Sequence, residues 1–203
     1  MNVNKAENIL YELSQGKTIG GKPYSFGHIK HVALLASSIA KNCDLDPDKA
    51  YVFGLLHDIG RFFVIDDKGE MIINDKHRHP IEGYLYLKRM GYDEEARICI
   101  THAFPSRKNI YSHLYTEIEN KVISEVLEQE YDQYDLLIQL ADEMSVMNGW
   151  CTLESRLARE ALENGYHYDD WERFEHLHEI KMMFDKLAEV DIYSFIMHNI
   201  LFA

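Results

Sequence analysis

Basic residues are scarce in this sequence, and they form no dense run. The chain has 21 Lys and Arg against 34 Asp and Glu, which gives a formal net charge of -13. This charge repels the phosphates of DNA and RNA, so we expect no long nucleic acid as a partner. A small phosphorylated molecule remains compatible with it, because a bound divalent cation can reverse the local field inside an acidic protein.

Long apolar runs are also missing. No window approaches 18 uncharged apolar residues, and the first residues lack the basic start and apolar stretch of a signal peptide. The three cysteines, Cys43, Cys99 and Cys151, form no CxxC pair and leave an odd count, which fits buried thiols in a reducing compartment. We therefore expect a cytoplasmic protein without a membrane contact. The sequence also contains no P-loop and no dinucleotide-binding fingerprint.

Helical periodicity dominates what is present. With 203 residues, 46% hydrophobic and 27% charged, the chain is expected to form a single domain over residues 1–203. The apolar spacing predicts an all-α fold, a compact multi-helix bundle. The expected helices cover residues 6–13, 24–43, 47–60, 80–90, 93–103, 117–130, 133–149, 154–164, 170–188 and 190–201. Two short apolar runs suggest a small β-hairpin near 62–73.

Four polar side chains stand out inside these helices. His28 lies one turn before Val32 on an apolar stripe, so it is predicted to point inward. His57 and Asp58 are adjacent and differ by about 100° around a helix, so both can reach one ion only where the helix ends. Asp142 lies in a helix that is apolar on both sides, where a carboxylate has to be paired or bound to a metal.

The sequence resembles the HD-domain phosphohydrolases of the HDIG type. The resemblance rests on His28, on LLHDIGR around His57 and Asp58, and on LADEMS around Asp142. It covers about residues 24–150 as a catalytic core, and leaves residues 151–203 as a C-terminal helical extension. It implies that His28, His57, Asp58 and Asp142 bind the metal.

This ligand chemistry predicts a metal-dependent phosphohydrolase. Imidazoles with carboxylates suit Mn, Fe, Co, Ni or Zn better than Mg or Ca. The expected reaction is in-line attack of metal-bound hydroxide on a phosphomonoester, phosphodiester or phosphoanhydride of a small molecule, with a nucleotide as the favoured substrate. Asp58 could also position or deprotonate the attacking water, which gives it a catalytic role.

Further residues are candidates for contact with the substrate. His79 and His102 resemble histidines that HDIG-type proteins place near the metal, either against the substrate phosphate or on a second ion. One ion is therefore expected, and two if both histidines bind metal. Arg61 could clamp a phosphate in the catalytic site, and Arg107 and Lys108 could reach the substrate from a loop. Each of these cations has an alternative role as an ordinary solvated charge.

Two alternatives stay open at this stage. A degenerate HD domain could act as a nucleotide-binding signalling or protein-interaction module, although the four intact ligand residues speak against it. The cyclic-dinucleotide phosphodiesterase branch is disfavoured, because Arg61 stands where that branch has a lysine and no GYP segment occurs. The sequence leaves the oligomeric state open, with a homodimer as one possibility.

Overall fold

Helices make up most of the molecule, as predicted. This computed structural model describes residues 1–19, 22–23, 26–66, 70–72, 77–108, 112–165 and 168–200. The α-helices are α1 (Val3–Ser14), α2 (Gly27–Asn42), α3 (Pro47–Leu56), α4 (Arg78–Arg89), α5 (Asp93–Thr101), α6 (Glu117–Leu127), α7 (Gln133–Glu143), α8 (Leu153–Asn164), α9 (Tyr168–Ala188) and α10 (Tyr193–Ile200). Two 3-10 helices, η1 (Ile59–Phe63) and η2 (Ser112–Leu114), lie between them. The predicted all-α bundle is confirmed.

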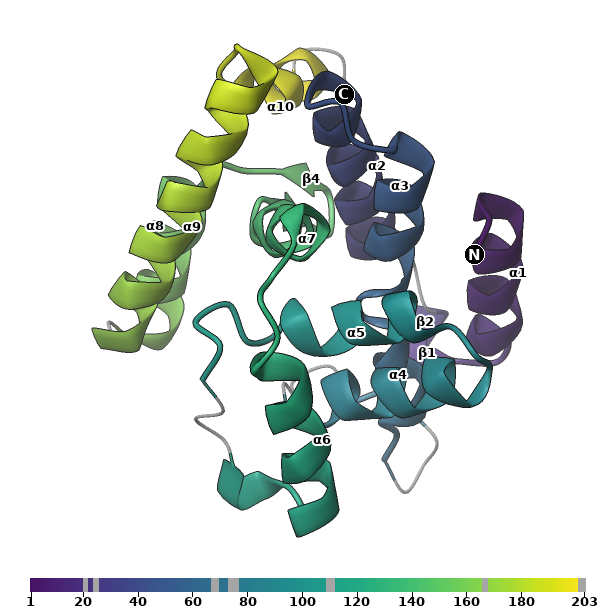
Figure 1. Cartoon of the computed structure of the whole chain (residues 1–203). Helices are drawn as coiled ribbons and strands as arrows, with labels where there is room; N and C mark the ends of the chain where they lie inside the picture. The colour runs from purple at the N-terminus through teal and green to yellow at the C-terminus, as the bar shows by residue number, and fades with distance from the viewer. Residues whose placement is uncertain are drawn as a thin grey trace.

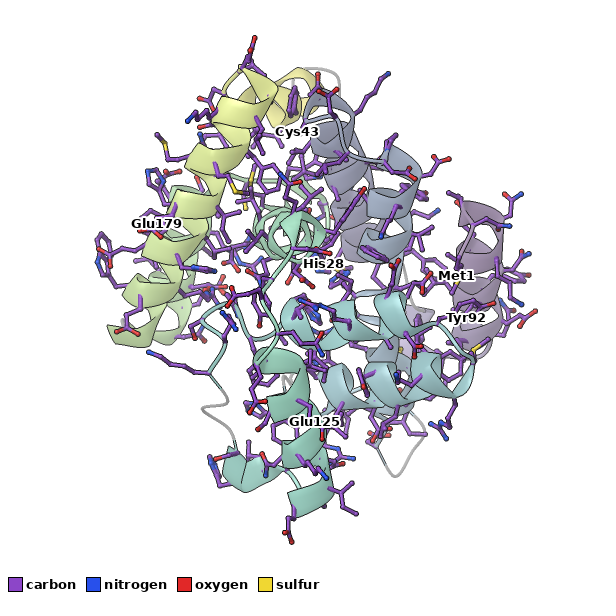
Figure 2. All side chains as sticks on the ribbon, viewed as in Figure 1. Met1, His28, Cys43, Tyr92, Glu125 and Glu179 are labelled. Atoms are coloured by element: carbon purple, nitrogen blue, oxygen red, sulfur yellow. The ribbon has the colours of Figure 1, made fainter. Side chains whose placement is uncertain are left out.

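Helix α7 lies at the centre of the bundle (Figure 1). It packs against α2, α3, α5 and α9, and its residues Leu137, Ile138, Leu140 and Ala141 are completely buried. Figure 2 shows side chains filling the space between α7 and these surrounding helices. A helix buried on most of its surface gives any polar side chain near its end an environment that excludes bulk water.

Local chemistry explains where α3 begins and how closely it packs. The side chain of Asp46 accepts from the backbone N–H groups of Asp48 and Lys49, and Pro47 takes the first helical position. At Gly54 a Cβ would lie 2.5 Å from the Cα of Ala33, so only glycine lets the backbones of α3 and α2 come this close.

The helix predicted over 133–149 is shorter in the structure. Helix α7 ends at Glu143, and β3 (Ser145–Val146) then pairs with the antiparallel strand β4 (Gly149–Trp150). The backbone N–H of Cys151 donates to the carbonyl of Met144, which closes the hairpin at the helix end. The Asn148-Gly149 dipeptide is a strong hairpin signal, and the helical apolar pattern across it concealed the turn.

The segment near 62–73 is only partly a hairpin. Residues up to Phe63 belong to η1, and a single antiparallel bridge then joins Ile65 to Met71. The turn that would connect them, residues 67–69, lies outside the described residues, as do residues 73–76. Another two-residue hairpin, β1 (Thr18–Ile19) with β2 (Lys22–Pro23), precedes α2. Among the described helices, none combines the length and apolar character needed to cross a bilayer.

Candidate metal centre

The His57-Asp58 pair lies at the end of α3, where the backbone leaves the helix. α3 ends at Leu56, earlier than the predicted Gly60, and η1 begins directly after Asp58. A Cβ on Gly60 would lie 1.8 Å from the carbonyl oxygen of His79, so this glycine lets η1 rest on the backbone of α4. The break in the helix turns both side chains to one side, and the contact with α4 brings His79 to them.

His28, His57 and Asp142 form one cluster across three helices. Nε2 of His28 lies 2.9 Å from Oδ1 of Asp142, and Nε2 of His57 lies 3.6 Å from the same oxygen. One ligand atom from each residue lies within 4.8 Å of the others, so this group could hold a metal ion. The residues come from the start of α2, the end of α3 and the end of α7.

Asp58 joins this cluster to a second one. Its Oδ2 lies 3.6 Å from Nε2 of His57 and 4.0 Å from Nε2 of His28. Its Oδ1 faces the other way, 3.2 Å from Nε2 of His79 and 3.6 Å from Nε2 of His102. His57, Asp58 and His102 form a second group that could hold an ion, so the carboxylate of Asp58 lies between two possible ion positions.

Two of the histidines have a fixed tautomer. Nδ1 of His57 donates to the carbonyl oxygen of Gly54 at 2.7 Å, and Nδ1 of His102 donates to that of Ile98 at 3.0 Å. Because a carbonyl only accepts, each Nδ1 carries the proton and each Nε2 presents a lone pair to the centre. This is the arrangement that metal-binding histidines use.

Buried atoms at the centre also lack hydrogen bonds. Nε2 of His57 and Oδ1 of Asp58 are both buried, and neither makes a hydrogen bond within the described part of the chain. Leaving two such atoms unsatisfied costs folding free energy, whereas a cation between them would satisfy both. The donor set of imidazoles and carboxylates therefore fits a divalent transition metal.

The ionisable groups in the centre perturb one another. Burial acts to raise the pKa of Asp58, but the charge of Arg61 and the interactions with the surrounding histidines outweigh it and hold that pKa well below its usual value. Burial acts in the same way on Asp142, whose pKa is held low by His28 and His57. Both carboxylates are therefore ionised and ready to bind a cation at neutral pH.

The predicted cations are distributed unequally. Nε of Arg61 lies 2.5 Å from Oδ2 of Asp58, and its side chain lines the same cavity as His28. Arg107 donates to the carbonyls of Leu127 and Glu128 at the end of α6, and Lys108 lies 3.9 Å from Glu172. Neither lines the cavity within the described part of the chain, so geometry adds no support to the prediction that they bind substrate.

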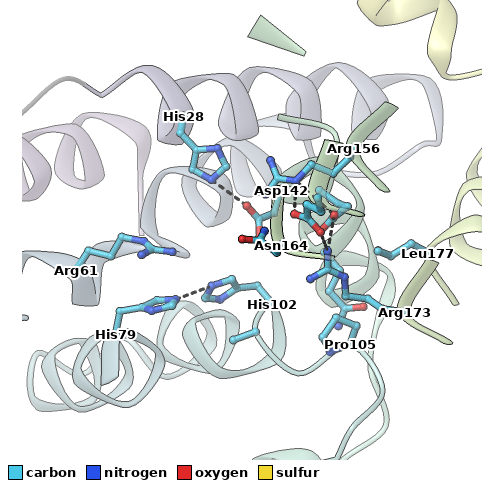
Figure 3. Close-up of a pocket in the computed structure, with 14 residues that line it drawn as sticks. His28, Arg61, His79, His102, Pro105, Asp142, Arg156, Asn164, Arg173 and Leu177 are labelled. Atoms are coloured by element: carbon cyan, nitrogen blue, oxygen red, sulfur yellow. Dashed lines mark hydrogen bonds and ion pairs between the residues drawn. The ribbon is translucent and has the colours of Figure 1, made fainter. Parts of the chain in front are cut away.

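A cavity of about 440 Å³ opens beside the centre. Figure 3 shows His28, Arg61, His79, His102 and Asp142 around one part of it, and Arg156 and Arg173 at another. The sequence did not predict the residues contributed by α8 and α9, which are Arg156, Glu160, Asn164, Arg173 and Leu177. Only the spacing of Arg156 and Glu160 on one helix face could have suggested a pair there.

A family model described as HD domain matches residues 25–147. The chain belongs to the HD domain family. No curated protein and no solved structure matches it. The matched segment contains every residue of the two clusters, and it ends before α8. These residues are His28, His57, Asp58, His79, His102 and Asp142. HD domains bind divalent metals and belong to a superfamily made up mostly of hydrolases, which agrees with the donor set described above.

Proposed function

We propose that this protein is a metal-dependent phosphohydrolase of a small phosphorylated molecule, with nucleotides as the first class to test. The observation that carries the proposal is that His28, His57 and Asp142 lie together next to Asp58, and that Nε2 of His57 and Oδ1 of Asp58 are buried there without a hydrogen bond in the described chain. An HD domain with all four of these residues and an adjoining cavity has what hydrolysis of a phosphate ester or anhydride requires.

Each residue has a distinct task in this proposal. His28, His57, Asp58 and Asp142 would hold one divalent ion, and His79 and His102 with Asp58 a second. The ion would supply acidity to a bound water and polarise a phosphoryl oxygen. Asp58, ionised at neutral pH, would orient the attacking water, and the acidity that the ion gives to this water would let the carboxylate take up its proton. Arg61 at the cavity wall would bind a phosphoryl oxygen.

The test combines metal content with turnover. The purified protein would be assayed for bound transition metal, and for hydrolysis of p-nitrophenyl phosphate, bis-p-nitrophenyl phosphate and nucleoside mono-, di- and triphosphates with added Mn²⁺, Co²⁺ or Ni²⁺. We expect bound metal and hydrolysis of at least one substrate, and His57→Ala to abolish both. His113→Ala, which changes an exposed histidine, is the matched control and should leave both unchanged.

The same assay separates the enzyme from a binding module. A degenerate HD domain would bind nucleotide without hydrolysing it under any metal. That result, with stoichiometric metal present, would overturn the proposed activity. Retention of full activity in His57→Ala would instead overturn the proposed ligand set.

A further inference from the structure

The cavity beside the metal centre has a second polar region, formed around the C-terminal helices. We call Glu143, Arg156, Glu160 and Arg173 the distal cluster, and they come from α7, α8 and α9. All four line the cavity that His28 and Asp142 also line. Figure 3 shows Arg156 and Arg173 on one side of Asp142, with Arg61 on the opposite side.

The distal cluster is bound together by ion pairs. Arg156 Nε lies 2.8 Å from Glu160, and Arg173 Nη2 lies 2.6 Å from Glu160 and 2.9 Å from Glu143. Two guanidinium groups and two carboxylates give a formal charge of zero. The cluster therefore offers a bound molecule donors and acceptors side by side, and it does not present the net positive charge of a second phosphate site.

A neighbouring acceptor lacks a donor. Gln139 lines the cavity and is 2% exposed; its Nε2 donates to the carbonyl of Thr101, but its buried Oε1 makes no hydrogen bond within the described chain. A phosphate dianion has only acceptor atoms and so satisfies neither this oxygen nor the carboxylates. The part of the substrate that extends from the scissile phosphate therefore has to bring donors of its own.

The described part of the lining also offers no large aromatic side chain. Among the lining residues that the structure describes, none is Phe, Tyr or Trp, and the apolar contributions come from Ala103, Pro105 and Leu177. Binding of a nucleobase commonly uses an aromatic face, whereas hydroxyl groups both donate to carboxylates and accept from guanidinium groups. The cavity is thus better matched to a hydroxyl-bearing group than to a base.

We propose that the distal cluster and Gln139 select phosphate esters whose organic part carries hydroxyl groups, a sugar or polyol phosphate or the ribose of a nucleotide. This inference rests on the proposed function, because it concerns the organic part of a substrate whose phosphate binds at the metal centre. Helices α8 and α9, outside the segment that matches the family, then determine specificity.

The test compares two phosphomonoesters of five carbons each, one with hydroxyl groups and one without. Equilibrium binding of ribose 5-phosphate and of pentyl phosphate to the Mn²⁺-loaded protein would be measured by calorimetry. A phosphomonoester is the substrate of monoester hydrolysis and a product of diester hydrolysis, so both ligands report on the site in either reaction. We expect ribose 5-phosphate to bind at least about tenfold more tightly.

Variants assign this preference to the distal cluster. Arg156→Gln should bring ribose 5-phosphate to the affinity of pentyl phosphate and leave pentyl phosphate within about twofold. Arg159→Gln makes the same change on the exposed face of α8 and is the control. Because Arg156→Gln leaves Glu143 and Glu160 with Arg173 as the cation that still pairs with both, Arg156→Lys keeps the lost charge as a second variant, and melting temperatures monitor folding.

The possible results separate this inference from the proposed function. Equal affinities in the wild type, or an equal loss for both ligands in a folded Arg156 variant, would overturn the distal site even if hydrolysis is observed. A preference that depends on Arg156 in a protein without turnover would support the distal site and overturn the enzyme. A protein that binds neither ligand and hydrolyses nothing would overturn both.

Discussion

Nε2 of His28 and Oδ1 of Asp142 lie 2.9 Å apart, so the first turn of α2 contacts the last turn of α7 through a single polar pair. The pair lies at the edge of the core in which Leu137, Ile138 and Leu140 of α7 are buried. A contact of this kind between helices far apart in the sequence is costly to bury unless something is gained from it. The most direct gain is a place for a cation.

Asp142→Asn tests that interpretation. The amide keeps the size of the side chain but loses the negative charge, so we expect metal content to fall by at least about tenfold and hydrolysis to disappear. Metal analysis after gel filtration measures the first, and the phosphatase assay the second. Asp93→Asn removes a charge from an exposed aspartate and should change neither. Full activity in Asp142→Asn would exclude Asp142 as a ligand.

Arg61→Gln should separate substrate binding from metal binding. The guanidinium both pairs with Asp58 and faces the cavity, so its loss should raise KM by about tenfold to a hundredfold. The pKa of Asp58 should rise when the Arg61 charge is removed, which moves the acid limit of metal retention to higher pH. Arg89→Gln, on an exposed site, is the control. An unchanged KM would show that Arg61 pairs with Asp58 but does not bind the substrate.

Gly60→Ala should disrupt the centre through the backbone. The added methyl would meet the carbonyl of His79 and the backbone nitrogen of Gly83, neither of which can rotate away. We expect a loss of about 3 kcal/mol in the free energy of unfolding, measured with urea, together with reduced metal binding. At Gly91 nothing lies within 4 Å of the added methyl, so Gly91→Ala should cost only local backbone strain and keep the metal.

Stability of the metal-free protein should fall on both sides of neutral pH. Burial acts to lower the pKa of His28, but its hydrogen bond to Asp142 and the charge of Asp142 raise it above 6.5. The stabilisation from this histidine is therefore complete below pH about 6.5 and is lost as the pH rises through the raised pKa. Asp58 and Asp142 have lowered pKa values, so their contribution is present above pH about 4 and is lost on further acidification.

Urea unfolding in the presence of a chelator, repeated across the pH range, measures this dependence. His28→Gln should remove the loss on the alkaline side and reduce, without removing, the loss on the acid side, because Arg61 still lowers the pKa of Asp58. If the variant keeps the same alkaline loss as the wild type, the His28–Asp142 pair is not its cause.

The sequence predicted the helices well because many of them have an apolar period or a recognisable end. Asp46 and Pro47 mark the start of α3 in the structure as they do in the sequence. The end of α7 was missed because Met144 and Met147 continue the apolar period into a segment where the backbone turns back as β3 and β4. Met147 is exposed in the structure, so its apolar side chain at helical spacing did not report burial on a helix face.

The candidate centre could be predicted from the sequence because its residues are metal-binding types inside apolar helices. The distal cluster could not be predicted in this way. His28, His57, Asp58 and Asp142 stand out as polar groups on apolar helix faces. Arg156 and Arg173 look like ordinary surface cations, and they become cavity residues only because α8 and α9 pack beside α7. Arg107 shows the converse, since a cation in a promising loop is bound to the end of α6 instead.

The two close approaches at Gly54 and Gly60 have a consequence for how this protein can change over time. Main-chain atoms of α2, α3, η1 and α4 rest directly on one another there, and the carbonyl of Gly54 also orients His57. Side chains elsewhere in the interior can therefore be exchanged without moving the imidazoles. We therefore expect related sequences to vary in their buried apolar residues and to keep Gly54 and Gly60.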